Sequence, residues 1–339
     1  HHAVNNSGRI SAQAIEQRGG EIYLVAAGRD IAHTGILDAS GGDGRIVLAG
    51  DRDITLTSGA LVEASGDRGS VLAIAGGSLD HQAGAHVDVG GQGGTVELSG
   101  RGRVRIAGSV DLGRNGHLLI DPATMTIGDG VDADLQTSTL EALLQNNDRG
   151  STVHIVATDT ITIQDLGGDN TLNGVNPTDD TKGAGLRLET DTCDQFGGFG
   201  ECIGSVTRSS AGSIAIQGAD DTLDIAGDIS IIGGSSSSTV NVNARLISGG
   251  DVSIEAADAI DVTNTIDAGG NVAMYANGNI HVGGDIHARG RVDLMTTAGG
   301  IDVQNVTVTG RTGIDDLHDA EINIARTGAS TSAAVSTGT

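Results

Sequence analysis

The sequence predicts an all-β chain folded as a parallel β-helix with three strands per turn, a loop-rich insertion and one short helix. One pattern occurs three times between residues 250 and 310 at a spacing of 20, which places Val252, Val272 and Val292 in equivalent positions. Within each row, apolar and polar residues alternate with the period of strands that bury one face. Glycine is abundant, at 55 of 339 residues, whereas Trp is absent and only four residues are Phe or Tyr. Stacked turns with glycine corners and a narrow aliphatic lumen fit both observations.

Residues 8–122 are expected to form a first β-helix array. The rows here repeat at a longer period: Ile46, Val71 and Val96 are 25 residues apart, and Ile22 precedes Ile46 by 24. A longer surface turn in each row accounts for the difference, because surface connections tolerate insertions. Outward side chains are expected between the apolar positions, at Arg45, Thr55, Glu97 and Arg105, and at the two tyrosines, Tyr23 and Tyr275.

Residues 123–211 are interpreted as a transition segment, because the row pattern changes there. The stretch TSTLEALLQNNDRG, at 137–150, predicts a short helix capped by Thr137 or Ser138 with its leucines on one face. Strand alternation returns at 151–166. The rest of the chain is assigned to a second β-helix array, 212–328, and a disordered tail, 329–339.

The stretch 167–211 is the least repetitive and predicts a loop insertion. Cys193 and Cys202 lie in it with eight residues between them, and two cysteines without a nearby His do not complete a zinc site. A disulfide that closes a surface loop of an exported protein is therefore expected. The only phenylalanines lie between these cysteines, either packed in a small closed knot or exposed as a binding tip. The candidate binding residues are Phe196, Phe199, Asp194 and Lys182.

The charge of the chain excludes several classes of partner. A formal net charge of −25, with Lys182 as the single lysine, leaves no basic surface for nucleic acid or for an anionic membrane. The acidic residues either confer solubility or bind calcium at Asp-rich turns, although no RTX-type nonapeptide repeat is present. No apolar run reaches membrane-spanning length, so membrane insertion is not expected.

No catalytic set stands out in the sequence. Asp220 and Asp221 are adjacent, and adjacent strand residues point to opposite faces, while Asp191 and Asp194 only flank Cys193. The ten His are scattered and are interpreted as surface or turn residues, and neither a phosphate-binding loop nor a nucleophile elbow is present. We therefore expect no enzyme activity, no metal and no cofactor, with a carbohydrate-active β-helix enzyme as the alternative.

Three stretches resemble a known family. GHLLIDPATMTI at 116–127, the following TSTLEALLQNN and then STVHIVATDTITI are similar to the segment downstream of the secretion domain in two-partner-secretion exoproteins. These are the filamentous-haemagglutinin-like and high-molecular-weight-adhesin-like proteins of Gram-negative bacteria. The rows before this segment, such as GRIVLAGDRDITLTSGALVEASG, also resemble that family. The resemblance covers residues 8–170.

The resemblance implies a right-handed β-helix stalk secreted through a TpsB-type outer-membrane transporter and displayed on, or released from, the cell surface. The family's secretion domain, with its NPNG- and NPNL-type motifs, is not in these residues, which implies a passenger fragment. We expect a surface adhesin whose loop region binds a host surface, a glycan or a biofilm polysaccharide. Two alternatives remain: the carbohydrate-active enzyme, and a passive stalk of a contact-dependent toxin or a haem-acquisition exoprotein.

Overall fold

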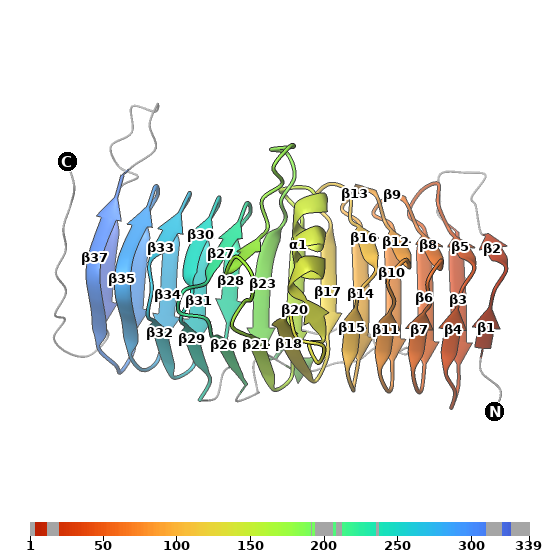
Figure 1. Cartoon of the computed structure of the whole chain (residues 1–339), viewed down its shortest axis with the longest axis horizontal. Coiled ribbons are helices and arrows are strands. Elements are labelled where there is room, and N and C mark those ends of the chain that lie inside the picture. The colour runs from red at the N-terminus through yellow and green to blue at the C-terminus, as the bar shows by residue number, and fades with distance from the viewer. Residues whose placement is uncertain are drawn as a thin grey trace.

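The computed structural model is a parallel β-helix whose turns stack along the long axis of the molecule (Figure 1). Each turn contributes a strand to three walls in succession, and all strand pairs between turns are parallel. The prediction of an all-β parallel coil with one helix is thereby confirmed. The structure describes residues 4–11, 20–190, 192–193, 206–207, 212–234, 237–309 and 321–326.

The first wall is a 12-stranded sheet that runs the length of the rod. Each strand pairs only with the strands of the turns before and after it, so the sheet has no break between the predicted arrays. One coil therefore includes both arrays and the transition segment. The strands of wall 1 are β3 (Glu21–Ala26), β6 (Arg45–Gly50), β10 (Ser70–Ala75), β14 (Thr95–Gly100), β17 (His117–Asp121), β20 (Thr152–Ala157), β23 (Gly185–Thr190), β28 (Ile229–Ile232), β31 (Val252–Ala256), β34 (Val272–Ala276), β36 (Val292–Thr296) and β38 (Ile322–Arg326).

The second wall receives the next strand of each turn. Near the middle, the short strand β19 is inserted between β15 and β18, so the transition segment adds an extra strand to this wall. Its strands are β1 (Val4–Asn6), β4 (Ile31–His33), β7 (Ile54–Leu56), β11 (Leu79–His81), β15 (Val104–Ile106), β19 (Leu135–Gln136), β18 (Thr124–Gly128), β21 (Thr160–Ile163), β26 (Ser213–Ile216), β29 (Thr239–Val242), β32 (Ala259–Val262), β35 (Ile280–Ala288) and β37 (Ile301–Val308).

The third wall consists of two stretches of strands separated by the helix. The later halves of β35 and β37 continue its second stretch, because these long strands bend from the second wall into the third. The first stretch contains β2 (Arg9–Ser11), β5 (Ile36–Asp38), β8 (Leu61–Glu63), β12 (His86–Asp88) and β16 (Ser109–Asp111), with β9 (Gly66–Asp67) and β13 (Gly91–Gln92) pairing at a corner; the second contains β22 (Thr171–Asn173), β27 (Thr222–Ile225), β30 (Arg245–Ser248) and β33 (Ile266–Ala268).

The lumen is filled by columns of stacked aliphatic side chains. Val252 pairs with Val272 and Val272 with Val292, and all three side chains are at most 1% exposed. Glycine corners permit this close stacking: a Cβ on Gly269 would lie 2.4 Å from the carbonyl oxygen of Gly249 in the preceding turn. The predicted columns are confirmed, and they make the coil one continuous core.

Two histidines correct the expectation that all His lie at the surface or in turns. His33 and His81 end strands of the second wall and point into the lumen, where both are fully buried. Burial lowers the pKa of His81 to about 4, and His86 nearby adds to the shift. The ring is therefore neutral at physiological pH, which allows it to occupy an interior column.

Helix α1 (Thr137–Asn146) takes the place of a strand in the third wall, between β16 and β22 (Figure 1). Its apolar face, Leu140, Leu143 and Leu144, is buried as predicted. The predicted cap is wrong, because the N-cap is Gln136 in extended conformation, without a side-chain cap hydrogen bond, and Thr137 and Ser138 are already helical. Strand β19 runs directly into the helix, which leaves no turn for a capping side chain.

Polar side chains of the helix segment replace the hydrogen bonds that a strand would have made. Asn147, directly after α1, accepts from Leu112 N (2.8 Å) and donates to Val110 O (3.1 Å) at the edge of β16. On the other side, Glu141 Oε1 accepts from Asn173 N (2.8 Å), at the edge of β22. The helix therefore seals two strand edges that would otherwise be unpaired.

Candidate functional site

The outer face of wall 1 carries a continuous column of side chains, here called the outer column. Its members occupy equivalent positions on successive strands from β17 to β36, as the strand register shows. Val156, Glu189 and Ile232 in the middle of this column are buried, so that a ligand could reach only Asp121 at one end and the stretch from Glu255 to Met295 at the other. The outer column consists of Asp121, Val156, Glu189, Ile232, Glu255, Tyr275 and Met295.

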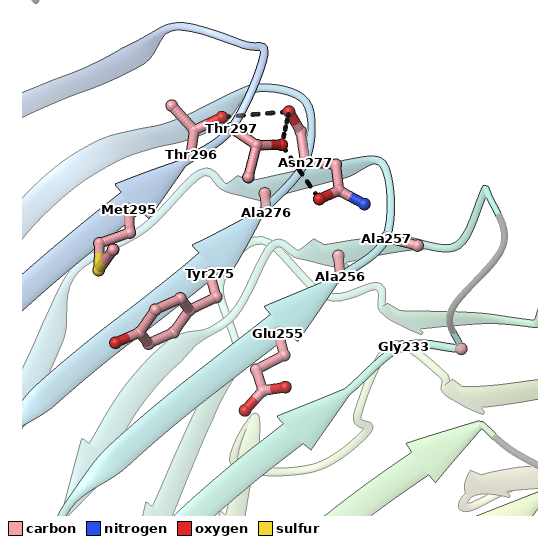
Figure 2. Close-up of a pocket in the computed structure, with 11 residues that line it drawn as sticks. Gly233, Glu255, Ala256, Ala257, Tyr275, Ala276, Asn277, Met295, Thr296 and Thr297 are labelled. Carbon is pink, nitrogen blue, oxygen red and sulfur yellow. Dashed lines mark hydrogen bonds between the residues drawn. The ribbon is translucent and has the colours of Figure 1, made fainter. Parts of the chain in front are cut away.

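The outer column ends in a groove of about 270 Å³, located where β31, β34 and β36 turn toward the second wall. Figure 2 shows Glu255, Tyr275 and Met295 side by side on successive strands, pointing to the same side of the sheet. Tyr275 is 43% exposed, the same fraction as Tyr23 near the other end of the sheet. Its ring is thus available for stacking on a ligand.

The upper rim of the groove is polar and uncharged. Thr297 Oγ1 donates to Asn277 Oδ1 at 3.1 Å, as Figure 2 shows, and this bond orients the exposed amide of Asn277. None of the eleven lining residues is basic, and Glu255 is the one charged residue among them. The groove combines an aromatic face with neutral hydrogen-bonding groups.

The groove adjoins the point where the insertion leaves the coil. Thr190, the last residue of β23, donates its hydroxyl to Gly212 O (2.9 Å) and accepts from Gly234 N (2.9 Å). Gly234 also lines the groove. After Thr190 the chain forms an antiparallel pair, β24 (Thr192–Cys193) with β25 (Val206–Thr207). Residues 171–173 and 185–190, by contrast, belong to the coil itself.

A cluster of polar side chains occupies the middle of the same face, and sequence reasoning did not find it. His154 Nε2 lies 3.0 Å from Glu189 Oε2, and Arg187 donates to the same oxygen from Nε at 2.9 Å and Nη2 at 2.7 Å. The His117 ring contacts the His154 ring edge-on, with centroids 5.3 Å apart. This wall cluster consists of Glu97, Ser99, His117, Asp121, His154, Arg187 and Glu189.

The environment of the wall cluster shifts the pKa of several members. Burial opposes ionisation of Glu189, but hydrogen bonds and charge from His154 and Arg187 prevail and lower its pKa to about 2. Burial lowers the pKa of His117 to about 4, with His154 adding to the effect, and burial also lowers the pKa of His154. At neutral pH this half of the cluster is an ion pair of Arg187 and Glu189 beside neutral imidazoles.

Asp121 and Glu97 form the other half of the wall cluster. Burial raises the pKa of Asp121 to about 7, and the charge of Glu97 adds to the shift. Ser99 donates its hydroxyl to Glu97 Oε1 at 2.9 Å. Ser99 and Asp121 are paired in the register of β14 and β17, so the two acidic residues lie on adjacent strands of one face. Comparing rows for acidic residues two positions apart on successive strands could have found this pair.

Most of the predicted binding residues lie outside the part of the chain that the structure describes. This holds for Asp194, Phe196, Phe199 and Cys202, so the disulfide and the aromatic tip stay predictions. Lys182 is described: it is half-buried, pairs in an isolated bridge with Asp148, and is not among the groove residues.

The acidic pair found in the sequence does not converge. Asp220 is exposed and Asp221 is 1% exposed, and both lie in the turn before β27 (Thr222–Ile225) rather than on a strand. Asp221 Oδ2 accepts from Leu166 N at 2.8 Å and ties two turns together. Within the described ranges, no group of three or more His, Cys, Asp or Glu side chains could hold a metal ion. Nor does that part of the chain contain a helix long and apolar enough to cross a membrane.

The comparisons with known proteins found no relative. No family model matches the chain, and neither a curated protein nor a solved structure is significantly similar to it. The groove and the wall cluster are therefore interpreted from their own chemistry.

Proposed function

We propose that the chain is part of a secreted bacterial adhesin, a β-helical rod whose outer column binds a neutral polysaccharide at the Tyr275 groove. The groove carries this proposal: a 43% exposed ring lies between Glu255 and Met295 on a rim of Asn277 and Thr297. Pyranose rings present an apolar face, which stacks on an aromatic ring, and an edge of hydroxyls, which bond to amides and hydroxyls.

Charge favours a neutral glycan over an acidic one. The groove has no basic side chain, and the chain has a net charge of −25. A polyanion such as an acidic polysaccharide or nucleic acid would be repelled over the whole surface, with nothing local to offset the repulsion. Neutral glycans of a host surface or of a biofilm matrix carry no such penalty.

Secretion and display follow from the resemblance to two-partner-secretion exoproteins. Most of the LLIDP segment lies on β17 and most of the TSTLEALLQNN segment on α1, so two of the three stretches that carry the resemblance lie near the middle of the rod. We propose a TpsB-type outer-membrane transporter as the export partner and the surface of a Gram-negative bacterium as the location. Adhesion would then use the groove and the neighbouring insertion, with no enzyme activity needed for binding.

A pair of matched tyrosine variants tests the groove. Tyr275→Ala should weaken binding to immobilised neutral polysaccharides about tenfold or more, the equivalent of about 1.4 kcal/mol. Tyr23→Ala is the control, because Tyr23 points outward from the same sheet at the other end and is also 43% exposed. Affinities for mixed-linkage glucan, xylan, galactan and a polyuronate would be measured for all three proteins.

Two outcomes would contradict the proposal. Equal polysaccharide affinities of Tyr275→Ala and Tyr23→Ala would show that the binding site does not include the groove. Absence of binding to every neutral polysaccharide would favour the passive-stalk alternative, in which the active part of the exoprotein lies elsewhere.

A further inference from the structure

A pocket of about 440 Å³ lies on the third wall, between helix α1 and the strands that precede it. Strands β12 and β16 and the turns before them form one side of the pocket. One face of α1, which packs beside β16, forms the other side (Figure 1). Volumes of about 300–1,000 Å³ are typical of sites for small ligands. Because the Tyr275 groove belongs to the first wall, this pocket is a separate site.

A serine and a histidine meet in the pocket from two successive turns of the coil. Ser109, the first residue of β16, pairs in register with His86, the first residue of β12. The Ser109 hydroxyl oxygen lies 2.8 Å from His86 Nδ1, although the two residues are 23 positions apart in the sequence. Ser109 is exposed and His86 is half-buried, so a ligand in the pocket can reach both. When Nε2 carries the ring proton, Nδ1 accepts the hydroxyl hydrogen bond, as a general base does from a nucleophile.

The amino-terminal end of α1 opens into the same pocket. Ser138 and Thr139, in the first turn of the helix, are lining residues. The first N–H groups of a helix have no partner within it, and the N-cap residue makes no side-chain hydrogen bond to them here. Three residues before Ser109 and Ser138, Ile106 pairs with Leu135. The start of the helix and the serine are therefore at the same end of the pocket, where the helix stabilises negative charge that develops on a carbonyl oxygen.

We propose that Ser109 is a nucleophile activated by His86, and that the pair hydrolyses short acyl esters in this pocket. Three separate observations support the proposal: a pocket of ligand size, a hydroxyl bonded to an imidazole, and a helix start without a cap. Together they supply the nucleophile, the base and the stabilisation of the oxyanion that acyl transfer requires. The activity goes beyond the proposed polysaccharide binding and does not depend on it.

Water is the only co-reactant that the reaction requires. His86 Nδ1 takes the hydroxyl proton as the Ser109 oxygen bonds to the ester carbonyl carbon. The bond from that carbon to the alcohol oxygen then breaks, and the alcohol leaves with the proton from Nδ1. A water molecule attacks the acyl group on Ser109, and Nδ1 takes a proton from that water. The proton passes to the Ser109 oxygen as the carboxylic acid is released, so both residues regain their starting states.

The lining of the pocket indicates the class of ester. Val110 and Leu143 are buried and contribute an apolar surface, and Ala142 adds a methyl group from the helix. A small acyl group can pack on these side chains. Asp111 is the one acidic residue among the twelve lining residues, which include neither Lys nor Arg. An anionic ester would be repelled there, so the substrate should be a short acyl ester of a neutral alcohol.

The pair lacks the orienting carboxylate of a catalytic triad. Within the described residues, no group forms a hydrogen bond with His86 Nε2. A serine and histidine without that third group should catalyse both steps slowly. An activated ester such as p-nitrophenyl acetate has a good leaving group, so it should transfer its acetyl group to Ser109 faster than water removes it.

The acetylated serine is the most specific readout of the proposal. The full chain would be incubated with p-nitrophenyl acetate, and peptide mass spectrometry would locate the acetyl group. We expect it on Ser109, and a fluorophosphonate probe should label the same residue. Ser109→Ala should lose both labels, and His86→Gln should slow acetylation at least about 100-fold, because a general base typically contributes that much or more.

Matched variants separate this activity from the slow reaction of any exposed imidazole with the ester. His287→Gln is the histidine control, because His287 is exposed on β35 and its Nδ1 lies 2.8 Å from a carboxylate, Asp267 Oδ1, instead of a serine. Ser253→Ala, on β31 of the first wall, is the serine control. Both should release p-nitrophenol at the wild-type rate. Circular dichroism would check that all variants are folded.

Three outcomes would overturn the proposal. These are an acetyl group that does not appear on Ser109, a wild-type rate in Ser109→Ala, and equal losses of rate in His86→Gln and His287→Gln. Polysaccharide binding that depends on Tyr275, without ester hydrolysis, would leave the proposed function intact and remove only this inference.

Discussion

At the scale of single residues, the side of the wall on which a side chain lies decides what a substitution costs. Val272 is fully buried between Val252 and Val292 in the lumen, whereas Thr263 is exposed directly after the inward residue Val262. A carboxylate in a dry lumen has no partner and no water, and its transfer from water is unfavourable by several kcal/mol.

We therefore predict that Val272→Asp lowers the free energy of unfolding by several kcal/mol, while Thr263→Asp changes it by less than about 0.5 kcal/mol. Denaturant unfolding of the two variants, monitored by circular dichroism, provides the comparison. Equal losses for the two substitutions would show that the inward and outward assignments are wrong.

Residue positions within one row were predictable, whereas contacts between rows were only partly so. The outward tyrosines and the valine column follow from alternation and from a constant spacing of 20. The Glu97–Asp121 pair was missed because the rows around it differ in length, so that its register depends on how each corner accommodates extra residues. His33 and His81 were misplaced for another reason: neutral imidazoles can occupy a column otherwise filled by aliphatic residues.

At the scale of elements, helix α1 shows how a coil can change from strand to helix without exposing its edges. Asn147 is 1% exposed, and its side chain bonds to Val110 O, to Leu112 N and, at 2.8 Å, to Leu143 O. The existence of the helix was predictable from its leucine spacing. Its place in the third wall was not, because only the three-dimensional structure shows which strand edges it covers.

Replacing Asn147 by Leu tests this sealing function. The substitution removes the partners of two buried backbone groups at the edge of β16, each worth about 1–3 kcal/mol when left unsatisfied. We expect Asn147→Leu to lower the free energy of unfolding by about 2–5 kcal/mol. Asn146→Leu, at the neighbouring exposed position, is the control and should stay within about 0.5 kcal/mol. Similar losses of unfolding free energy in both variants would mean that water, rather than Asn147, forms the hydrogen bonds to the backbone groups at the edge of β16.

At the scale of the whole molecule, the rod is a stack in which each turn contacts only its neighbours. The free energy of unfolding should then be a sum of contributions from single turns and from the interfaces between neighbouring turns. Complete rows should therefore be removable without loss of the fold. The later rows permit this design because residues 251–270 and 271–290 are two successive rows of 20, with equivalent positions paired throughout. Their removal would place Arg291 directly after Gly250, where the same strand begins again.

Deleting whole rows tests most directly whether the turns stack in register. The outer column, the lumen and the position of α1 all depend on that stacking. Removal of the 40 residues 251–290 should give a protein that unfolds in one cooperative transition and is shorter by about 10 Å in small-angle X-ray scattering. Removal of the 30 residues 261–290 begins in the middle of a row, so it leaves half a row in place and should prevent folding of the later turns. Loss of the fold in the first variant, or equal stability of both, would contradict a stacked coil.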